Sequence, residues 1–313
     1  MARISFPIPT SRRGQRSYRS SSGRNMFGVG RGGSRGSGLK MRLIIAAGIA
    51  IFALISYYGN PGDKNQITGE VERVAMADER EEEALGLQAA PQMIEQHGGE
   101  SPREFHRRRV SDMGKRLLAG LNDYIVERSQ DLGEPLDNPY EFKFHLLADS
   151  RTVNAFALPG GQVFITEALY ARLETDGQLA GVLGHEIGHV IERHGNKRMA
   201  QQSLFSGLAA AAGAAGGDES SARMAQAAAQ MISMSYGRDD ELESDKWGVR
   251  LCVLAGYDPN AMVGLMRILD EASPGGGPPE MLSTHPKPAN RVQYIQQVIE
   301  QEYPNGLPPG LEP

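Results

Sequence analysis

Cysteine and tryptophan are scarce in this sequence, since the 313 residues contain one of each, Cys252 and Trp247. A single cysteine excludes an intramolecular disulfide. Both residues lie in a stretch with the apolar spacing of a helix. We therefore expect Cys252 to be a buried structural thiol and Trp247 to belong to the core.

Acidic residues are missing from the first 42 positions, which carry ten Lys and Arg. The rest of the chain carries 23 Lys and Arg against 38 Asp and Glu, a net charge of -15. An acidic body argues against nucleic acid as a partner, because phosphate binding depends on clustered basic side chains. Residues 1–40 are rich in Gly, Ser and Arg and poor in large apolar side chains, so we predict that they are disordered.

Charge is also absent between Leu43 and Tyr58 (LIIAAGIAIFALISYY). This run, extended by the snorkelling stems of Lys40 and Arg42, predicts a transmembrane anchor over residues 41–58 that contacts the lipid bilayer. A buried core helix and a cleaved signal peptide are the alternatives. The flank SYYGNPGDK lacks the small-x-small pattern of a cleavage site, which favours an uncleaved anchor.

The charge asymmetry predicts an orientation. By the positive-inside rule the basic head stays in the cytoplasm and the acidic body crosses the membrane. In a bacterium the chain is then a single-pass inner-membrane protein with its body in the periplasm. An Arg- and Ser-rich head without acids is also typical of a mitochondrial transit peptide, so the mitochondrial inner membrane is the alternative.

Composition and hydrophobic spacing predict a mainly α fold with a small β-sheet (α+β) behind the anchor. The expected division is a disordered head (1–40), the anchor (41–58), a polar linker (59–100), a folded domain (101–303) and a Pro-rich, loose tail (304–313). Helices are expected after Ser101 and over about 167–174, 176–194, 239–255 and 288–302, with two more within 199–234. Strands are expected over 141–148 and 162–165, and residues 153–156 are expected to be extended. The acidic run at 78–83 is expected to be a solvated face.

The pattern H-E-x-x-H occupies residues 185–189, in the helix expected between the N-cap Thr175 and Gly195. His185 and His189 stand one turn apart on the same face, so both imidazoles can reach one zinc ion, with Glu186 beside the open position as general base. The alternative is an amphipathic helix whose histidines are satisfied by hydrogen bonds in the core.

A hydrolytic zinc site needs a third protein ligand. About fifty residues further on, Glu241 and Asp245 share one face of a predicted helix. One carboxylate can bind zinc while the other accepts the N–H of a ligating histidine and fixes its tautomer. We take Glu241 as the ligand and Asp245 as the histidine's partner. Asp239, Asp240 and Glu243 are expected to form an exposed acidic face.

These motifs resemble the HtpX and CAAX-prenyl-protease family of gluzincin zinc metallopeptidases, peptidase family M48. The resemblance covers roughly residues 101–303 and is closest to the single-anchor periplasmic or mitochondrial quality-control branch without tetratricopeptide repeats. Besides 185–189, it includes E-x-x-x-D at 241–245, NAFALPGG at 154–161 and STHP at 283–286 followed by Arg291. The family pattern usually reads E-x-x-A-D, and Ser244 stands here in place of Ala.

The resemblance implies a zincin-type domain with one Zn²⁺ per chain, in which Asn154, Ala155 and Phe156 form an edge that pairs with extended substrates. Zinc would activate a water, Glu186 would accept its proton, and His285 or Arg291 would be a second donor to the oxyanion. We also consider that His285 caps the zinc and keeps the enzyme latent, or that it merely packs in its loop.

The function expected from the resemblance is a membrane-anchored zinc metalloendopeptidase acting on misfolded or stalled envelope proteins, with unfolded or extended polypeptides as partners. The alternative is a zinc-dependent chaperone or assembly factor that binds extended clients with little proteolysis. Glu186 favours the enzyme, because a pure binder has no need of a base.

Overall fold

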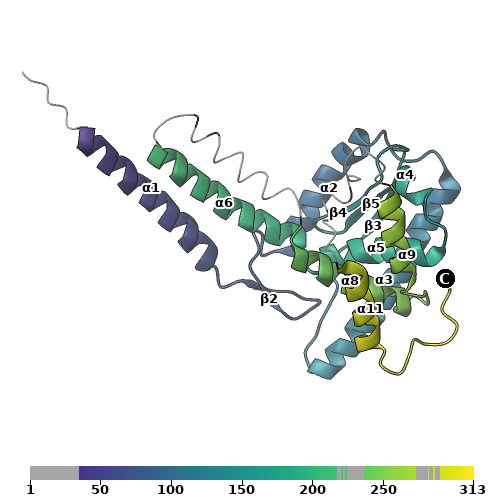
Figure 1. Ribbon diagram of the computed structural model, residues 1–313. Coiled ribbons are helices and arrows are strands. Elements are labelled where there is room, and N and C mark those ends of the chain that lie inside the picture. The colour runs from purple at the N-terminus through teal and green to yellow at the C-terminus, as the bar shows by residue number, and fades with distance from the viewer. Residues whose placement is uncertain are drawn as a thin grey trace, which may run out of the picture.

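The computed structural model describes residues 35–216, 236–272 and 290–313, together with Ser220, Arg223, Met281 and His285. The described part is mainly helical with small sheets, so the predicted fold class is confirmed. A pair of helices projects from a body that holds the other elements (Figure 1). Most of the predicted disordered head and the second helix expected before Met234 lie outside the described residues.

The projecting pair consists of α1 (Arg35–Tyr58) and α6 (His194–Gly216). The two helices pack side by side (Figure 1). α1 contains the predicted anchor but begins at Arg35, so residues 35–40 extend this helix instead of belonging to a disordered head. Within the described ranges, Gly38–Tyr58 is the one helical segment long and apolar enough to cross a membrane.

The main sheet has the strand order β3-β5-β4. β3 (Lys143–Leu147) is parallel to β5 (Gln162–Thr166), and β4 (Ala155–Leu158) is antiparallel to β5. The strands and the extended stretch predicted from sequence are confirmed to within two residues. β5 is entirely buried because it is central, whereas β4 lies at an edge among the described strands.

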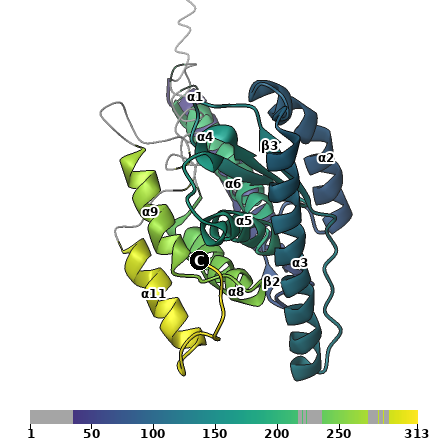
Figure 2. The same ribbon diagram turned by 90° about the vertical axis from the view of Figure 1, so that its right-hand side faces the viewer.

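The body is built around α5 (Asp176–Ile191), in which every residue after Asp176 is buried. The Thr175 side chain caps it by accepting the N–H of Gln178, as the sequence predicts. Figure 2 shows α5 between two groups of helices. On one side lie α2 (Glu79–Gln96) and α3 (Glu104–Leu132), and on the other lie α9 (Ala261–Glu271) and α11 (Arg291–Glu302). α8 (Arg238–Leu254) packs directly on α5, and the short α4 (Glu167–Tyr170) follows β5.

Glycines let α5 and α8 approach closely. A Cβ on Gly188 would lie 3.0 Å from Cα of Ser244, and one on Gly184 would lie 3.3 Å from Cα of Gly248. Side chains larger than hydrogen would push the helices apart. The contact therefore places the H-E-x-x-H turn of α5 directly beside the acidic first turns of α8.

The predicted end of α5 at Gly195 is wrong. α5 ends at Ile191, Arg193 adopts a left-handed backbone with φ 51°, and α6 starts at His194 and includes Gly195. The buried Arg193 guanidinium contacts Asp63 at 2.5 Å and Glu82 at 2.7 Å. These two ion pairs hold Arg193 in the turn between the helices, in a backbone conformation that glycine adopts more easily than a residue with a side chain.

Residues 59–100, expected as a polar linker, contain β1 (Asp63–Lys64), β2 (Val71–Glu72) and α2. Asn196 accepts the backbone N–H groups of Ala75 and Met76 at 2.8 and 2.9 Å. Glu82 is 1% exposed, so the expected solvated face is wrong for this residue. The division into domains remains a prediction, but this segment packs on the body.

The tail expected to be loose also packs on the body. The N–H of Glu312 donates to the carbonyl of Gly256 at 2.9 Å, and the N–H of Asp258 donates to the carbonyl of Glu312 at 2.7 Å. The carbonyl of Pro313 accepts the N–H of Gly177 in the first turn of α5 at 3.0 Å. Main-chain hydrogen bonds, which periodicity in side chains does not reveal, fix this segment.

Candidate metal centre

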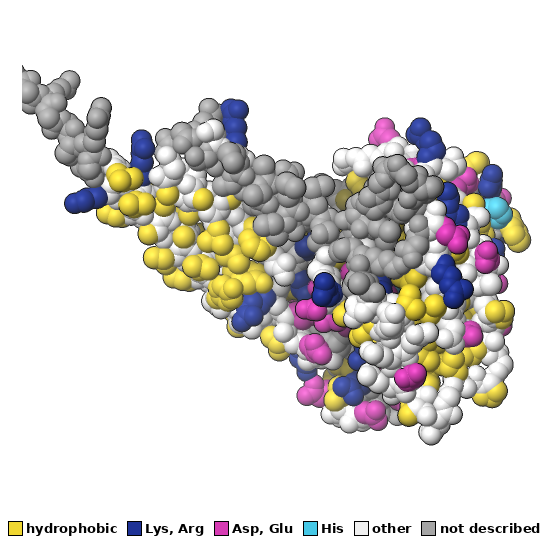
Figure 3. All heavy atoms as spheres, viewed as in Figure 1, with side chains coloured by type: hydrophobic (Ala, Val, Ile, Leu, Met, Phe, Trp, Pro, Cys, Tyr) yellow, Lys and Arg dark blue, Asp and Glu magenta, His cyan; other side chains and the backbone are white. Residues whose placement is uncertain are grey.

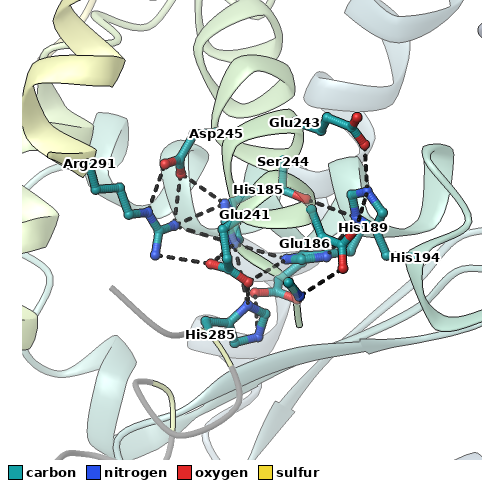
Figure 4. Close-up of polar contacts among 12 residues, drawn as sticks. His185, Glu186, His189, His194, Glu241, Glu243, Ser244, Asp245, His285 and Arg291 are labelled. Atoms are coloured by element: carbon teal, nitrogen blue, oxygen red, sulfur yellow. Dashed lines mark hydrogen bonds and ion pairs between the residues drawn. The ribbon is translucent and has the colours of Figure 1, made fainter. Parts of the chain in front are cut away.

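Four buried side chains bring metal-binding atoms together (Figure 4). His185 and His189 come from α5, Glu241 from the first turn of α8, and His285 from the segment between α9 and α11. None of the four is more than 2% exposed. The structure thus gathers the three predicted ligands and the predicted capping histidine in one place.

The donor atoms of this group have the spacing of a tetrahedral site. Nε2 of His185 lies 3.1 Å from Nε2 of His189 and 3.4 Å from Nδ1 of His285. The Glu241 carboxylate lies 3.0 Å from His285, 3.5 Å from His189 and 3.6 Å from His185. Ligand atoms about 2.0–2.1 Å from a tetrahedral zinc are about 3.3 Å from one another. The spacing fits one such ion.

The surroundings of His185 fix its tautomer. Its Nδ1 lies 3.0 Å from Oδ1 of Asp245, and a carboxylate can only accept, so Nδ1 carries the proton and Nε2 presents a lone pair. Arg291 donates to the same carboxylate at 2.7 and 2.8 Å. Burial alone would raise the pKa of Asp245, but Arg291 and His185 hold it below its ordinary value. Asp245 therefore lies where its predicted role requires, and the role itself remains a prediction.

The outer nitrogen of His189 meets a histidine. Nδ1 of His189 lies 2.9 Å from Nδ1 of His194, whose Nε2 lies 2.9 Å from Oε2 of Glu243. Because the carboxylate only accepts, His194 donates from Nε2 and accepts at Nδ1 from His189. His189 therefore also presents a lone pair at Nε2. Burial holds the pKa of His189 well below its ordinary value, which keeps the ring neutral.

Sequence reasoning missed His194 and assigned Glu243 to an exposed acidic face. The Glu243 side chain is 48% exposed, yet it binds His194. Ser244, at the position where the family pattern has Ala, also lies 3.3 Å from Nδ1 of His194. The sequence signals that could have revealed this pair are a histidine shortly after the H-E-x-x-H pattern and the acidic residues on both sides of Glu241.

The residues fit a cation. Two imidazole lone pairs face each other at 3.1 Å beside a carboxylate, and a buried group of acceptors like this requires positive charge, of which the Arg291 guanidinium, 3.1 Å from Glu241, supplies a part. Oε2 of Glu241 makes no hydrogen bond among the described residues, although the Arg291 guanidinium lies 3.1 Å from it. Two imidazoles and a carboxylate are the donor set of many hydrolytic zinc sites. This part of the chain can therefore hold a metal.

Glu186 is completely buried, and neither of its carboxylate oxygens has a hydrogen-bond partner in the described structure. The Nε2 atom of His285 lies 3.8 Å from Oε1 of Glu186. Burial raises the pKa of Glu186, because a low-dielectric environment disfavours the charged carboxylate. A carboxylate with a raised pKa beside the metal ligands is suited to accept and return a proton.

His285 and Arg291 occupy different places. Burial would lower the pKa of His285, but the carboxylates of Glu186 and Glu241 raise it above its ordinary value. Arg291 is 1% exposed, and its guanidinium contacts both Asp245 and Glu241, the latter at 3.1 Å. Tyr236, which sequence reasoning did not single out, stacks on His189 with 4.0 Å between ring centroids.

The predicted substrate edge lies near this group. Asn154 and Ala155 are 2% and 0% exposed, and Phe156 is half-buried and stacks on Phe164. The next part of the edge, 157–159, borders the same small hollow as His189 and Tyr236. The end of β4 therefore borders the same hollow as one of the candidate metal ligands.

Comparison with known proteins agrees with this chemistry. The model for peptidase family M48 matches residues 120–299. The chain is 33% identical over 215 residues to a putative beta-barrel assembly-enhancing protease of Vibrio cholerae, covering 65% of this chain and 41% of that protein. It is 34% identical over 207 residues to the beta-barrel assembly-enhancing protease of Escherichia coli K12, covering 62% and 39%. It is 30% identical over 212 residues to the mitochondrial metalloendopeptidase OMA1 of Homo sapiens, covering 63% and 40%. The match spans about two fifths of these relatives.

Proposed function

Because this chain belongs to peptidase family M48 and is by that membership a metallopeptidase of the hydrolase class, we propose that it is a zinc-dependent endopeptidase with His185, His189 and Glu241 as its metal ligands. The observation that carries the proposal is the pair of imidazole lone pairs held 3.1 Å apart beside the Glu241 carboxylate. Hydrogen bonds to Asp245 and His194 aim both lone pairs at the same point.

Zinc held by His185, His189 and Glu241 would act as a Lewis acid, which would lower the pKa of a water molecule and polarise the scissile carbonyl. Glu186 accepts the proton of the attacking water and passes it to the leaving amine. Its burial and lack of hydrogen-bond partners among the described residues leave both oxygens available for this transfer. Asp245 keeps His185 in the tautomer that binds metal.

His285 is the better placed of the two predicted oxyanion donors, because Arg291 is already committed to two carboxylates. We assign Arg291 a positioning role toward Asp245 and Glu241. The contacts of His285 with Glu241 at 3.0 Å and His185 at 3.4 Å also support the hypothesis that it caps the metal and keeps the enzyme latent. On that hypothesis, His285→Ala raises cleavage of an unfolded substrate, and unchanged or lower cleavage contradicts it.

The proposed substrates are extended polypeptides that pair with the edge of β4, because main-chain bonding to a strand makes little demand on sequence. The relatives named beta-barrel assembly-enhancing proteases support misfolded or stalled envelope proteins as the class. We place the chain in the bacterial inner membrane with its body in the periplasm, anchored by α1. The OMA1 relatives favour the mitochondrial inner membrane as the alternative.

Cleavage of casein by the full-length chain tests the proposal, comparing the wild type with Glu186→Gln at matched zinc content. The full chain is needed because Asp63 and Glu82, which lie before the predicted domain, hold the buried Arg193. Cleavage by the wild type alone supports the endopeptidase and the base. If both proteins bind zinc and extended clients but neither cuts, even with His285→Gln, which removes the imidazole proposed to cap the metal and keeps an N–H donor, the chaperone alternative replaces it.

A further inference from the structure

The helix that continues from the metal-binding α5 changes character half-way. The first part of α6, HGNKRMAQQS from His194 to Ser203, is polar and charged. The second part, LFSGLAAAAGAAG from Leu204 to Gly216, contains no charged side chain and one hydroxyl. A helix this apolar all round, projecting from the body, requires a surrounding other than water or a partner that covers it.

The uncharged half of α6 packs on α1. A Cβ on Gly207 would lie 2.6 Å from Cβ of Ala53, so the backbones approach as closely as small residues allow. Ala53 is 8% exposed, whereas its neighbours Phe52 and Ile55 are 74% and 65% exposed. The space-filling view shows hydrophobic side chains gathered along α1 (Figure 3).

The polar boundaries of the two helices lie at the same level. α1 ends in Tyr57 and Tyr58, and the Arg73 guanidinium lies 5.9 Å from the Tyr58 ring centre. Tyr57 and Arg73 line one surface hollow together with Lys197 and Gln201 of the polar half of α6. Aromatic and basic residues are typical of the membrane–water interface. Beyond this level, α1 carries no charged side chain from Tyr58 back to Leu43, and α6 carries none from Leu204 to Gly216.

We propose that Leu204–Gly216 of α6 enters the lipid bilayer beside α1, forming a membrane-embedded helical pair. The proposal rests on the anchor assigned above and adds a second membrane contact. Thirteen helical residues extend about 20 Å, roughly two thirds of the hydrocarbon thickness. Because Gly207 lies against Ala53 inside the predicted span, α6 shares the depth of α1 wherever α1 crosses the membrane.

This insertion deepens the proposed function by fixing where cleavage occurs. α6 begins at His194, which bonds the metal ligand His189, and reaches its uncharged half ten residues later. Ten residues of helix span about 15 Å. The metal centre is thereby held at the membrane surface, and the structure assigns membrane-proximal segments of polypeptides as its substrates.

Site-specific fluorescence in lipid vesicles tests the insertion with the full-length chain. Ala212→Cys reports on the uncharged half of α6, Gln202→Cys on its polar half, and Ile51→Cys on the anchor. All three positions are exposed to the surroundings, and the fully buried Cys252 makes the unsubstituted chain a labelling blank. Each cysteine receives an environment-sensitive fluorophore, and quenching by nitroxide-bearing phospholipids is measured.

We expect the labels at 212 and 51 to emit at shorter wavelength and to be quenched to a similar extent, and the label at 202 to behave as in water. Quenching at 51 without quenching at 212 overturns the insertion of α6 and leaves the anchor. No quenching at either position overturns both. Casein cleavage, measured separately, decides the peptidase function independently of these outcomes.

Discussion

His185 and His189 stand one turn apart on α5, yet their outer nitrogens meet different surroundings. His185 is supported by Asp245 and Arg291, which are 0% and 1% exposed. His189 is supported by His194, which passes its other hydrogen bond to Glu243, a side chain 48% exposed. One proposed ligand is held by a buried ion pair, and the other by an imidazole at the start of the proposed membrane helix.

This difference in surroundings determines how strongly each of the two imidazoles is held in position. Removing one partner of a buried ion pair leaves an uncompensated charge, which costs several kcal/mol. Losing a neutral hydrogen bond that ends at an exposed carboxylate costs much less. Substitutions on the two sides should therefore differ in the size of their effects.

Asp245→Asn should give the largest loss, because it removes the negative charge of the carboxylate that the buried Arg291 guanidinium contacts most closely, at 2.7 and 2.8 Å. We expect a destabilisation on the order of 3–5 kcal/mol. Thermal unfolding in detergent at fixed zinc concentration measures it. Asp239→Asn, an exposed position on the same helix, is the control. Equal melting temperatures for the two variants would contradict the sealed ion pair on the His185 side.

Removal of the metal should affect both sides, because it leaves the two lone pairs of His185 and His189 facing each other. A ligand present at 100 to 1,000 times its dissociation constant stabilises the folded state by about 2.7 to 4.1 kcal/mol. A chelator should lower the melting temperature accordingly, and added zinc should restore it while magnesium should not. A melting temperature unaffected by chelation would count against a metal site.

His194→Gln should weaken zinc binding about 10- to 100-fold, because loss of such a supporting hydrogen bond loosens the ligand it orients. Competition with a chromogenic chelator measures the affinity. His97→Gln is the matched control, since His97 bonds Asp149 and does not belong to the metal cluster. If His194→Gln binds zinc as tightly as His97→Gln, then His194 does not position His189.

Glu243→Gln should have the smallest effect, because the carboxylate is about half exposed and water can replace it. We expect a change in zinc affinity of about twofold, corresponding to roughly 0.5 kcal/mol. The same chelator competition measures it beside His194→Gln. If Asp245→Asn, measured in the same competition, lost no more zinc affinity than Glu243→Gln, the asymmetry between the two sides would disappear.

Local periodicity accounts for what could be predicted. The i, i+4 spacing of His185 and His189, and of Glu241 and Asp245, is a property of one helix each and can be read directly from the sequence. The capping of α5 by Thr175 is equally local. The fold class followed from the same periodicity, because the helices and strands are regular over most of their length.

Contacts between distant segments explain what was missed. Arg193 adopts a positive φ because Asp63 and Glu82, more than a hundred residues earlier, hold its guanidinium. No pattern near residue 193 announces these partners, and the helix was therefore predicted to end at Gly195. The pairing of His194 with Glu243 likewise depends on the close packing of α5 and α8. Sequence spacing alone does not reveal it.

The zinc content of two matched variants shows whether Glu241 binds the metal. Glu241→Gln and Glu243→Gln are the same chemical change, two residues apart on α8. Measured by elemental analysis after equilibration with zinc and removal of the excess, the wild type and Glu243→Gln should retain one zinc per chain, and Glu241→Gln should lose it. Full retention by Glu241→Gln, or no zinc in the wild type, would contradict the proposed metal centre.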